Sequence, residues 1–190
     1  MDATPSSSPS APAGEQPAVP PPAVQRPVRT GLVAALLGIA AVVVLLDQLA
    51  KAWAVSRLGD GSSIDVLGSL VQLRLFRNPG AAFSFATGTT WIFTIVAIVV
   101  SVVIIRTSRR LGSRGWTLAL GLLLGGAIGN LLDRLFREPA FGQGHVVDFV
   151  DLPHLFVFNL ADAAITCAAV LIALLGLRGV GIEGDRAGKA

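Results

Sequence analysis

Four long apolar stretches fill most of this chain, and each one carries its polar residues at a single end. These residues come late, early, late and early in the four stretches: Asp47 and Lys51, then Asn78, then Asn130, Asp133 and Arg134, then Asn159 and Asp162. Consecutive helices that cross a membrane run in opposite directions, so this alternation puts every polar group at the same membrane face. The sequence therefore predicts one polar site at one face of a membrane bundle.

The composition agrees with membrane-spanning helices. The chain is 53% hydrophobic and 14% charged, with a mean hydropathy of +0.69, whereas a soluble domain carries about 25% charged residues. Crossing a bilayer core of about 30 Å takes roughly 17–25 apolar residues in a helix. Runs of this length lie within Thr30–Leu46, Pro79–Ile105, Gly115–Leu132 and Leu152–Leu177. We expect an all-α membrane protein with four transmembrane helices, because backbone groups in lipid must be satisfied within each helix.

The chain divides into a membrane domain and two tails. Residues 1–28 are rich in Pro, Ala and Ser and cannot bury a core, so they predict a disordered cytoplasmic tail. The four-helix domain is expected at 29–179, and a second cytoplasmic tail at 180–190.

One connection has the character of β-structure. Between the first two stretches, at 57–77, Ser63–Leu67 and Leu70–Arg77 flank a Gly68-Ser69 turn signal, and apolar residues alternate with polar ones. We predict a small extracytoplasmic hairpin there, resting on the membrane surface or over the site. The connection between the third and fourth stretches holds an apolar strip around Asp148, which we assign to a loop.

The basic residues predict the orientation of the bundle. Nine of the fifteen lie on the side that contains both termini: Arg26, Arg29, Arg106, Arg109, Arg110, Arg114, Arg178, Arg186 and Lys189. The remaining six lie on the side of the polar site. Positive charge favours the cytoplasmic side, so we expect both termini in the cytoplasm and the site outside. The net charge of +3 is thus explained by topology, and no nucleic-acid partner is expected.

Two polar clusters have more than one interpretation. Asp47 and Lys51 are four residues apart on one helix face and can form an ion pair, either as an interfacial anchor or as a brace for a site. Asn130, Asp133 and Arg134 also share a face, and the glycines before them, Gly125, Gly126 and Gly129, permit close helix packing. Arg134 either pairs with Asp133 alone or holds a substrate carbonyl or a lipid headgroup.

Two acids stand in apolar surroundings and suggest a reaction. Asp162 opens the fourth stretch, with Asn159 one turn before it, and Asp148 lies within Val-Val-Asp-Phe-Val. Two desolvated carboxyls held close together do not both ionise, so the anion can activate a water while the neutral acid donates a proton. This is the chemistry of aspartic proteases. A polar pathway for protons or solutes is the competing hypothesis. The single Cys167 and the two histidines do not suggest a metal site.

Five short motifs resemble those of the bacterial lipoprotein signal peptidase (signal peptidase II) family. In order they are DQLAK at 47–51, RNPGAAFS at 77–84, GNLLDR at 129–134, VVDF at 146–149 and FNLADAAI at 158–165. The resemblance covers roughly residues 30–178. It implies a four-helix membrane aspartic endopeptidase that removes the signal peptide of diacylglyceryl-modified prolipoproteins and cuts before the lipidated cysteine.

The resemblance also implies roles for individual residues. The catalytic pair matches Asp148 and Asp162; site-lining or substrate-binding positions match Asn78, Asn130, Arg134 and Asn159; supporting positions match Asp47, Lys51, Gly126 and Asp133. The expected partners are a lipid-modified prolipoprotein and membrane lipid, with a monomer in the bacterial inner membrane and no cofactor or metal. Ala50 departs from the family pattern, where a small hydroxyl residue is common. The connection between Asp148 and Asp162 is also short, so the resemblance does not imply the shape of the rim of the site.

Overall fold

The computed structural model describes residues 29–80 and 90–185. The predicted tail at 1–28 lies outside this range, as do residues 81–84 of the second motif and the last residues of the predicted tail at 180–190. The described part contains four helices long and apolar enough to cross a membrane. They are α1 (Thr30–Leu58), α2 (Thr90–Thr107), α3 (Arg114–Phe136) and α4 (Leu160–Leu177). The predicted set of four membrane helices is confirmed.

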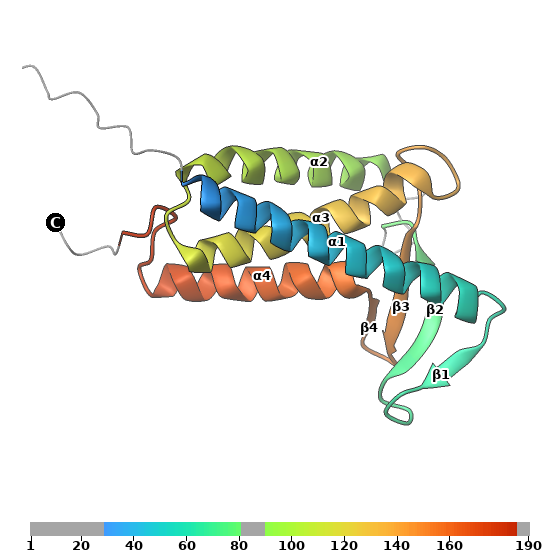
Figure 1. Ribbon diagram of the computed structural model, residues 1–190. Helices are drawn as coiled ribbons and strands as arrows, with labels where there is room; N and C mark the ends of the chain where they lie inside the picture. The colour runs from blue at the N-terminus through green and yellow to red at the C-terminus, as the bar shows by residue number, and fades with distance from the viewer. Residues whose placement is uncertain (1–28, 81–89, 186–190) are drawn as a thin grey trace, which may run out of the picture.

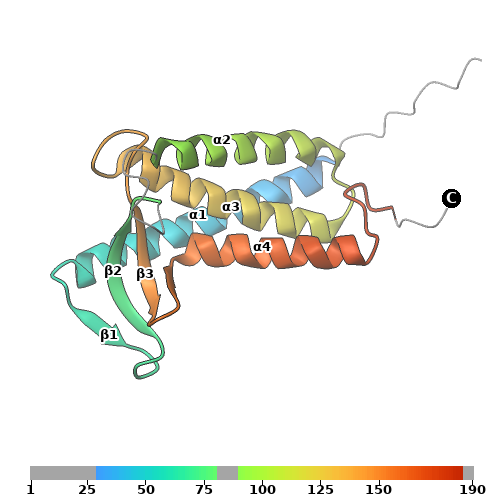
Figure 2. The same ribbon diagram turned by 180° about the vertical axis from the view of Figure 1, so that it is seen from behind.

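The bundle is built around α3 (Figures 1 and 2). This helix packs on each of the other three, whereas α1 and α2 barely touch in the described part of the chain. Half of the apolar window of α3 is buried, compared with 17–22% in the other helices. Because α1, α2 and α4 turn most of their surface outward, their apolar side chains remain available to lipid.

Glycines allow α1 to lie close against α3. Gly121, Gly125 and Gly129 repeat every four residues, so they share one face of α3. A Cβ atom at Gly125 would lie 2.6 Å from Cβ of Val43, and one at Gly129 would lie 2.8 Å from Oδ2 of Asp47. These distances leave no room for a side chain. The small residues therefore bring the helix backbones together, as is common in membranes.

The predicted β element is confirmed and is larger than the sequence indicates. Strands β1 (Ser63–Asp65) and β2 (Gln72–Asn78) come from the α1–α2 connection, and β3 (Val146–Leu152) and β4 (Phe156–Phe158) from the α3–α4 connection. All neighbours pair antiparallel in the order β1-β2-β3-β4. The assignment of Asp148 to a loop was wrong: it lies in β3, opposite Phe76 of β2. Pairing with β2 was not visible in the sequence of β3 alone.

The last turns of α1 hold this sheet at one end of the bundle. With 29 residues, α1 is roughly 43 Å long, which exceeds a bilayer core of about 30 Å. Its C-terminal residues Ala54 and Leu58 are buried against Val147 and Phe149 of β3. The sheet and the end of α1 therefore form a second hydrophobic cluster, separate from the one between the membrane helices.

The chain folds back onto the bundle after α4. Residues 180–185, which the sequence assigns to a tail, lie against the connection between α2 and α3. The amide of Gly112 donates to the carbonyl of Ile182 (2.9 Å) and the indole Nε1 of Trp116 donates to the carbonyl of Val180 (2.8 Å). This end of the molecule lies opposite the sheet (Figure 1).

The close contact at Gly125 predicts opposite effects for two glycine substitutions. Gly125→Ala should lower the free energy of unfolding by about 1–3 kcal/mol, because the added methyl group overpacks the contact with α1. Gly38→Ala is the matched control, since nothing lies within 4 Å of a Cβ there, and it should be neutral or stabilise the helix by up to about 1 kcal/mol. Unfolding in detergent measures both variants. Equal effects would contradict the packing role of Gly125.

Candidate active site

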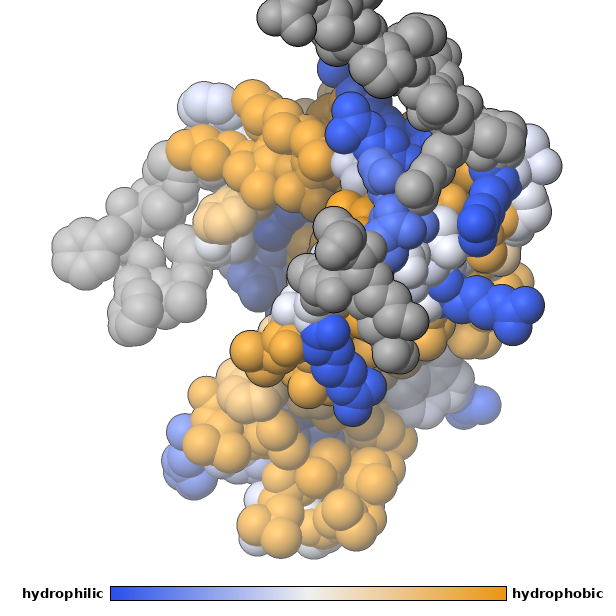
Figure 3. Space-filling view, turned by 90° about the vertical axis from the view of Figure 1, so that its left-hand side faces the viewer, coloured by the Kyte–Doolittle hydropathy of each residue, from blue (hydrophilic) through white to orange (hydrophobic). Residues whose placement is uncertain are grey.

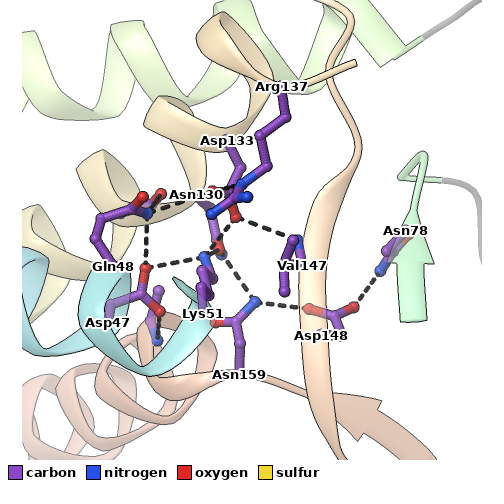
Figure 4. A network of polar contacts seen from close by, with 12 residues as sticks. Asp47, Gln48, Lys51, Asn78, Asn130, Asp133, Arg137, Val147, Asp148 and Asn159 are labelled. Carbon is purple, nitrogen blue, oxygen red and sulfur yellow. Dashed lines mark hydrogen bonds and ion pairs between the residues drawn. The ribbon is translucent and has the colours of Figure 1, made fainter. Parts of the chain in front are cut away.

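The predicted site residues meet at the end of the bundle that carries the sheet, and Figure 4 shows the network that most of them form. They come from five elements and from the residue before α4. In chain order these are Asp47 and Lys51 of α1, Asn78 of β2, Gly126, Asn130, Asp133 and Arg134 of α3, Asp148 of β3, Asn159 at the N-cap of α4, and Asp162 in its first turn. The late, early, late, early pattern in the sequence thus becomes one polar cluster.

Asp148 is buried in strand β3 and is held by two amides. Its side chain is 2% exposed. Oδ1 accepts from Nδ2 of Asn159 (2.6 Å) and Oδ2 accepts from Nδ2 of Asn78 (2.9 Å). Burial raises the pKa of Asp148 above its ordinary value, and the neighbouring carboxyl of Asp162 adds to the increase, while the two amides oppose it. The net direction is upward, so the neutral form of Asp148 is favoured relative to an exposed aspartate.

Asp162 is fixed by the start of its own helix and by α3. Asn159 and Asp162 form a capping box: Oδ1 of Asn159 accepts from the Asp162 amide (2.9 Å), and Oδ2 of Asp162 accepts from the Asn159 amide (3.3 Å). The other oxygen, Oδ1, accepts from Nδ2 of Asn130 (2.8 Å). A carboxylate in the first turn also interacts favourably with the helix dipole.

The amides that face the acids have a defined orientation. The carbonyl oxygen of Asn159 accepts the Asp162 amide, and that of Asn78 accepts the Gly80 amide (2.8 Å). Each side chain therefore turns its Nδ2 donor toward Asp148. Nδ2 of Asn159 also donates to Oδ1 of Asn130 (3.2 Å). The two acids are thus linked through the Asn159 and Asn130 amides.

Lys51 is the central cation of this network. It is completely buried, and its ammonium contacts Oδ2 of Asp47 (2.9 Å), Oδ2 of Asp133 (2.8 Å) and Oδ1 of Asn130 (2.9 Å). Three partners match the three donors of an ammonium group. Complete burial does not agree with an anchor that extends to the interface. The contact with Asn130 leaves Nδ2 of that amide directed at Asp162.

The two carboxylates beside Lys51 each connect to another element. Oδ1 of Asp47 accepts from the Ala161 amide in the first turn of α4 (2.9 Å), so α1 caps α4 directly. Oδ2 of Asp133 accepts from the Val147 amide (3.2 Å), which joins α3 to β3 one residue before Asp148. Gly126 provides the third close approach, because a Cβ there would lie 2.5 Å from the Ala161 carbonyl oxygen.

Two members of the network were missed in the sequence. Gln48 donates to the Gly129 carbonyl (3.0 Å) and to the carboxylates of Asp47 and Asp133. Arg137 pairs with Oδ1 of Asp133. Signals for both were present: Gln48 lies inside the DQLAK motif, and Arg137 follows Asp133 by one helical turn. Each is polar next to an acid whose role was already suspected.

Arg134 has an environment different from that of the other cations. It is 8% exposed, and its guanidinium carbon lies 5.1 Å from the centroid of the Phe93 ring. Asp133 pairs with Lys51 and Arg137 instead of with Arg134. Nη1 of Arg134 is buried without a hydrogen-bond partner among the described residues, and a Cβ at Gly80 would lie 3.2 Å from it. A buried donor without a partner is costly and is suited to an acceptor supplied by a ligand.

Comparison with known proteins identifies similar sequences and structures. The model of the family described as Signal peptidase (SPase) II matches residues 39–178, a range that contains all ten predicted site residues. The Lipoprotein signal peptidase of Leifsonia xyli subsp. xyli is 50% identical over 157 residues, 82% of this chain and 73% of that protein. That of Rhodococcus jostii is 50% identical over 153 residues, 80% and 77% of the two chains.

A similar fold is also found among solved structures. A bacterial membrane enzyme determined by the in meso method at 1.9 Å resolution superposes with a TM-score of 0.68 and 28% sequence identity. The match covers 77% of this chain and 94% of that chain.

Removal of the Lys51 charge should destabilise the whole cluster. Lys51→Met leaves the carboxylates of Asp47 and Asp133 buried without their shared cation, so we expect a loss of about 3–5 kcal/mol in the free energy of unfolding. Arg57→Met on the exposed last turn of the same helix is the control and should leave stability unchanged. Thermal unfolding in detergent compares the two. A Lys51→Met protein as stable as the control would show that the ion pairs of Lys51 with Asp47 and Asp133 are dispensable for stability.

Proposed function

We propose, from the premise that this chain belongs to the signal peptidase II family, that Asp148 and Asp162 are its catalytic residues. The family is an aspartic peptidase family, and the chain is a lipoprotein signal peptidase. Its reaction is removal of the signal peptide from diacylglyceryl-modified prolipoproteins, with cleavage before the lipidated cysteine.

The observation that carries the proposal is the hydrogen-bonded link between the two acids. Asp148 and Asp162 are connected through the amides of Asn159 and Asn130, at distances of 2.6, 3.2 and 2.8 Å. Neither acid pairs with a cation in the described part of the chain. Two acids that are close and lack such a partner favour a state in which one proton is shared between them.

This shared proton supports hydrolysis of a peptide bond. The ionised carboxylate accepts a proton from a water molecule as that water attacks the scissile carbonyl carbon. The neutral carboxyl group donates its proton to the oxyanion or to the leaving amine nitrogen. Burial of Asp148 raises its pKa and stabilises its neutral form.

Arg134 is proposed to bind a carbonyl oxygen of the substrate. Its Nη1 atom is buried and without a partner among the described residues, and a guanidinium offers planar, directional donors. Contact with the Phe93 ring restrains the group in one plane. Asn78 lies in the same region at the end of β2 and is exposed, so it is proposed to contact substrate as well as Asp148.

The remaining residues are proposed to position the acids. Lys51 orients Asn130, which in turn donates to Asp162. Asp133 binds the Val147 amide beside Asp148, and Asp47 binds the start of α4. Gly126 allows α4 to come close to α3. Their contacts are with the acids, with the amide that faces Asp162 and with the backbone beside the acids, so we propose that they act through the catalytic residues.

The orientation of the molecule is proposed from charge. In the sequence, nine of fifteen basic residues fall in the segments on the side of the two termini, which favours cytoplasmic termini and an extracytoplasmic site in the bacterial inner membrane. Exposed apolar side chains in the turn between β1 and β2, at Val66, Leu67 and Leu70, support contact of the sheet with the membrane surface. The proposed partners are the lipid-modified prolipoprotein and membrane lipid, bound by a monomer.

Single cysteines test this orientation. In a Cys167→Ala background, Ser69→Cys in the β1–β2 turn should react with a membrane-impermeant maleimide in intact spheroplasts, and Arg110→Cys at the opposite end should react only after lysis. Labelling of Arg110→Cys in intact spheroplasts would reverse the topology.

Substitution of either acid tests the catalytic assignment. Asp148→Asn and Asp162→Asn should each lower the rate of cleavage of a lipidated prolipoprotein by at least about 100-fold, because each removes general acid–base chemistry. Asp151→Asn is the matched control: Asp151 is also a buried acid of β3, but its partner is Arg74, outside the network. Activity within tenfold of wild type in either catalytic variant would overturn the dyad.

Arg134→Lys separates substrate binding from folding. Lysine keeps the positive charge but loses the planar donors, so kcat/KM should fall about tenfold or more while thermal stability in detergent is retained. If the variant loses folded yield and its remaining folded fraction has normal kcat/KM, Arg134 is structural.

A further inference from the structure

A groove runs between α1 and α2 on the outer surface of the bundle. Both helices pack on α3, and α1 also contacts the turn after α2. In the described part of the chain, α1 and α2 barely touch each other. One cavity of about 500 Å³ is bordered by a stripe of α1 from Leu37 to Gln48, with Leu124 and Ile128 of α3 beneath it. A second cavity of about 480 Å³ is lined by Thr30, Val33, Ile105, Ser108 and Arg109. Ile105 borders both, so the two cavities are neighbours along the helices.

The groove is long and apolar, with its polar groups at the ends. From Thr30 to Gln48, α1 rises roughly 27 Å, which approaches the bilayer core of about 30 Å. An acyl chain of one leaflet extends over about half of that core, so it matches the distance from Thr30 to Ala40. The α1 side chains along this half are Val33, Leu37 and Ala40.

The end of the groove near Arg109 is strongly basic. Six arginines surround this end of the bundle and are exposed: Arg29, Arg106, Arg109, Arg110, Arg114 and Arg178. Two acids, Glu183 and Asp185, share this end among the described residues. Hydrophilic side chains accordingly gather there, next to apolar surface (Figure 3). A site with cations at its mouth and an apolar channel behind them is complementary to an anionic lipid.

We propose that this half of the α1–α2 groove binds one anionic phospholipid. Its phosphate lies against the Arg109 guanidinium near the Thr30 hydroxyl, since arginine binds phosphate through paired donors. One acyl chain lies along Val33, Leu37 and Ile105. Basic pockets between membrane helices are suited to lipid headgroups, and basic residues near a membrane surface attract anionic lipid.

Charge also argues against the signal peptide of the substrate as the occupant. A signal peptide has a positively charged segment before its apolar core and a cleavage site after it. The proposed catalytic acids, Asp148 and Asp162, lie at the opposite end of the bundle from Arg109. A substrate helix in this groove would therefore bring its positive segment to the arginines. Like charges repel at such a contact. We therefore expect the substrate helix on a different face, and the groove occupied by lipid.

Lipid-dependent stability tests the proposal with the full-length protein. In detergent, phosphatidylglycerol should raise the melting temperature and be retained as one molecule in native mass spectrometry, and phosphatidylcholine with the same chains should do neither. Arg109→Gln should weaken the apparent affinity for phosphatidylglycerol about five- to tenfold. Arg178→Gln is the matched control, because it removes an exposed arginine at the same end but directly after α4, and it should change this affinity less than twofold.

A second variant tests the apolar part of the groove. Val33→Trp fills the channel while all arginines remain, so it should abolish retention of phosphatidylglycerol. Retention by this variant, or equal losses in Arg109→Gln and Arg178→Gln, would overturn the site in favour of diffuse charge attraction. Equal stabilisation by glycerol phosphate would show that an anion suffices without a chain, and displacement of the lipid by a synthetic signal peptide would assign the groove to substrate.

The proposal is independent of the catalytic assignment. Asp162→Asn should retain phosphatidylglycerol as the wild type does, because Asp162 lies at the other end of α4 from the arginines. Loss of lipid retention in this variant would contradict the separation of the two sites.

Discussion

The buried ammonium group of Lys51 is the interaction on which the site depends. It joins α1 to α3 through Asp47 and Asp133 and reaches Asn130, the amide that faces Asp162. A buried charge is stable only when it is paired and fully hydrogen-bonded. Since its partners must all be in place together, the ion cluster requires one arrangement of the helices. The carboxylates then extend this constraint to the start of α4 and to β3.

Close helix packing makes that arrangement possible. Gly129 leaves room for the carboxylate of Asp47, and Gly126 leaves room for the backbone at Ala161. Helix α3 thus provides glycines for close backbone contact and, one turn further on, Asp133 as a charged partner for Lys51. Because lipid gives no hydrophobic driving force between helices, close packing and polar contacts must hold the bundle. In this protein the two kinds of contact are adjacent in α3.

The sheet holds Asp148, the proposed catalytic residue, in place, and it also covers the end of α1. A free loop would not hold Asp148 in a defined position relative to Asp162. Strand β3 does so, because it is paired with β2 and buried against α1. Rigid elements hold functional groups more accurately than loops do. The opposite end of the bundle is different in character, with exposed arginines and an open groove in place of buried, paired charges. The molecule therefore has one end with buried polar groups and one end with exposed arginines.

The sequence by itself determined the four membrane helices, the common face of the polar residues and the two acids, because length, hydropathy and position along a helix are local properties. It also predicted the hairpin at 57–77 from its alternation. Only the tertiary structure decided that Asp148 lies in a strand paired with β2 and that Lys51 is buried instead of at the interface. It also decided that Asp133 pairs with Arg137 instead of with Arg134. These features depend on contacts between residues far apart in the chain, and spacing along one element does not specify them.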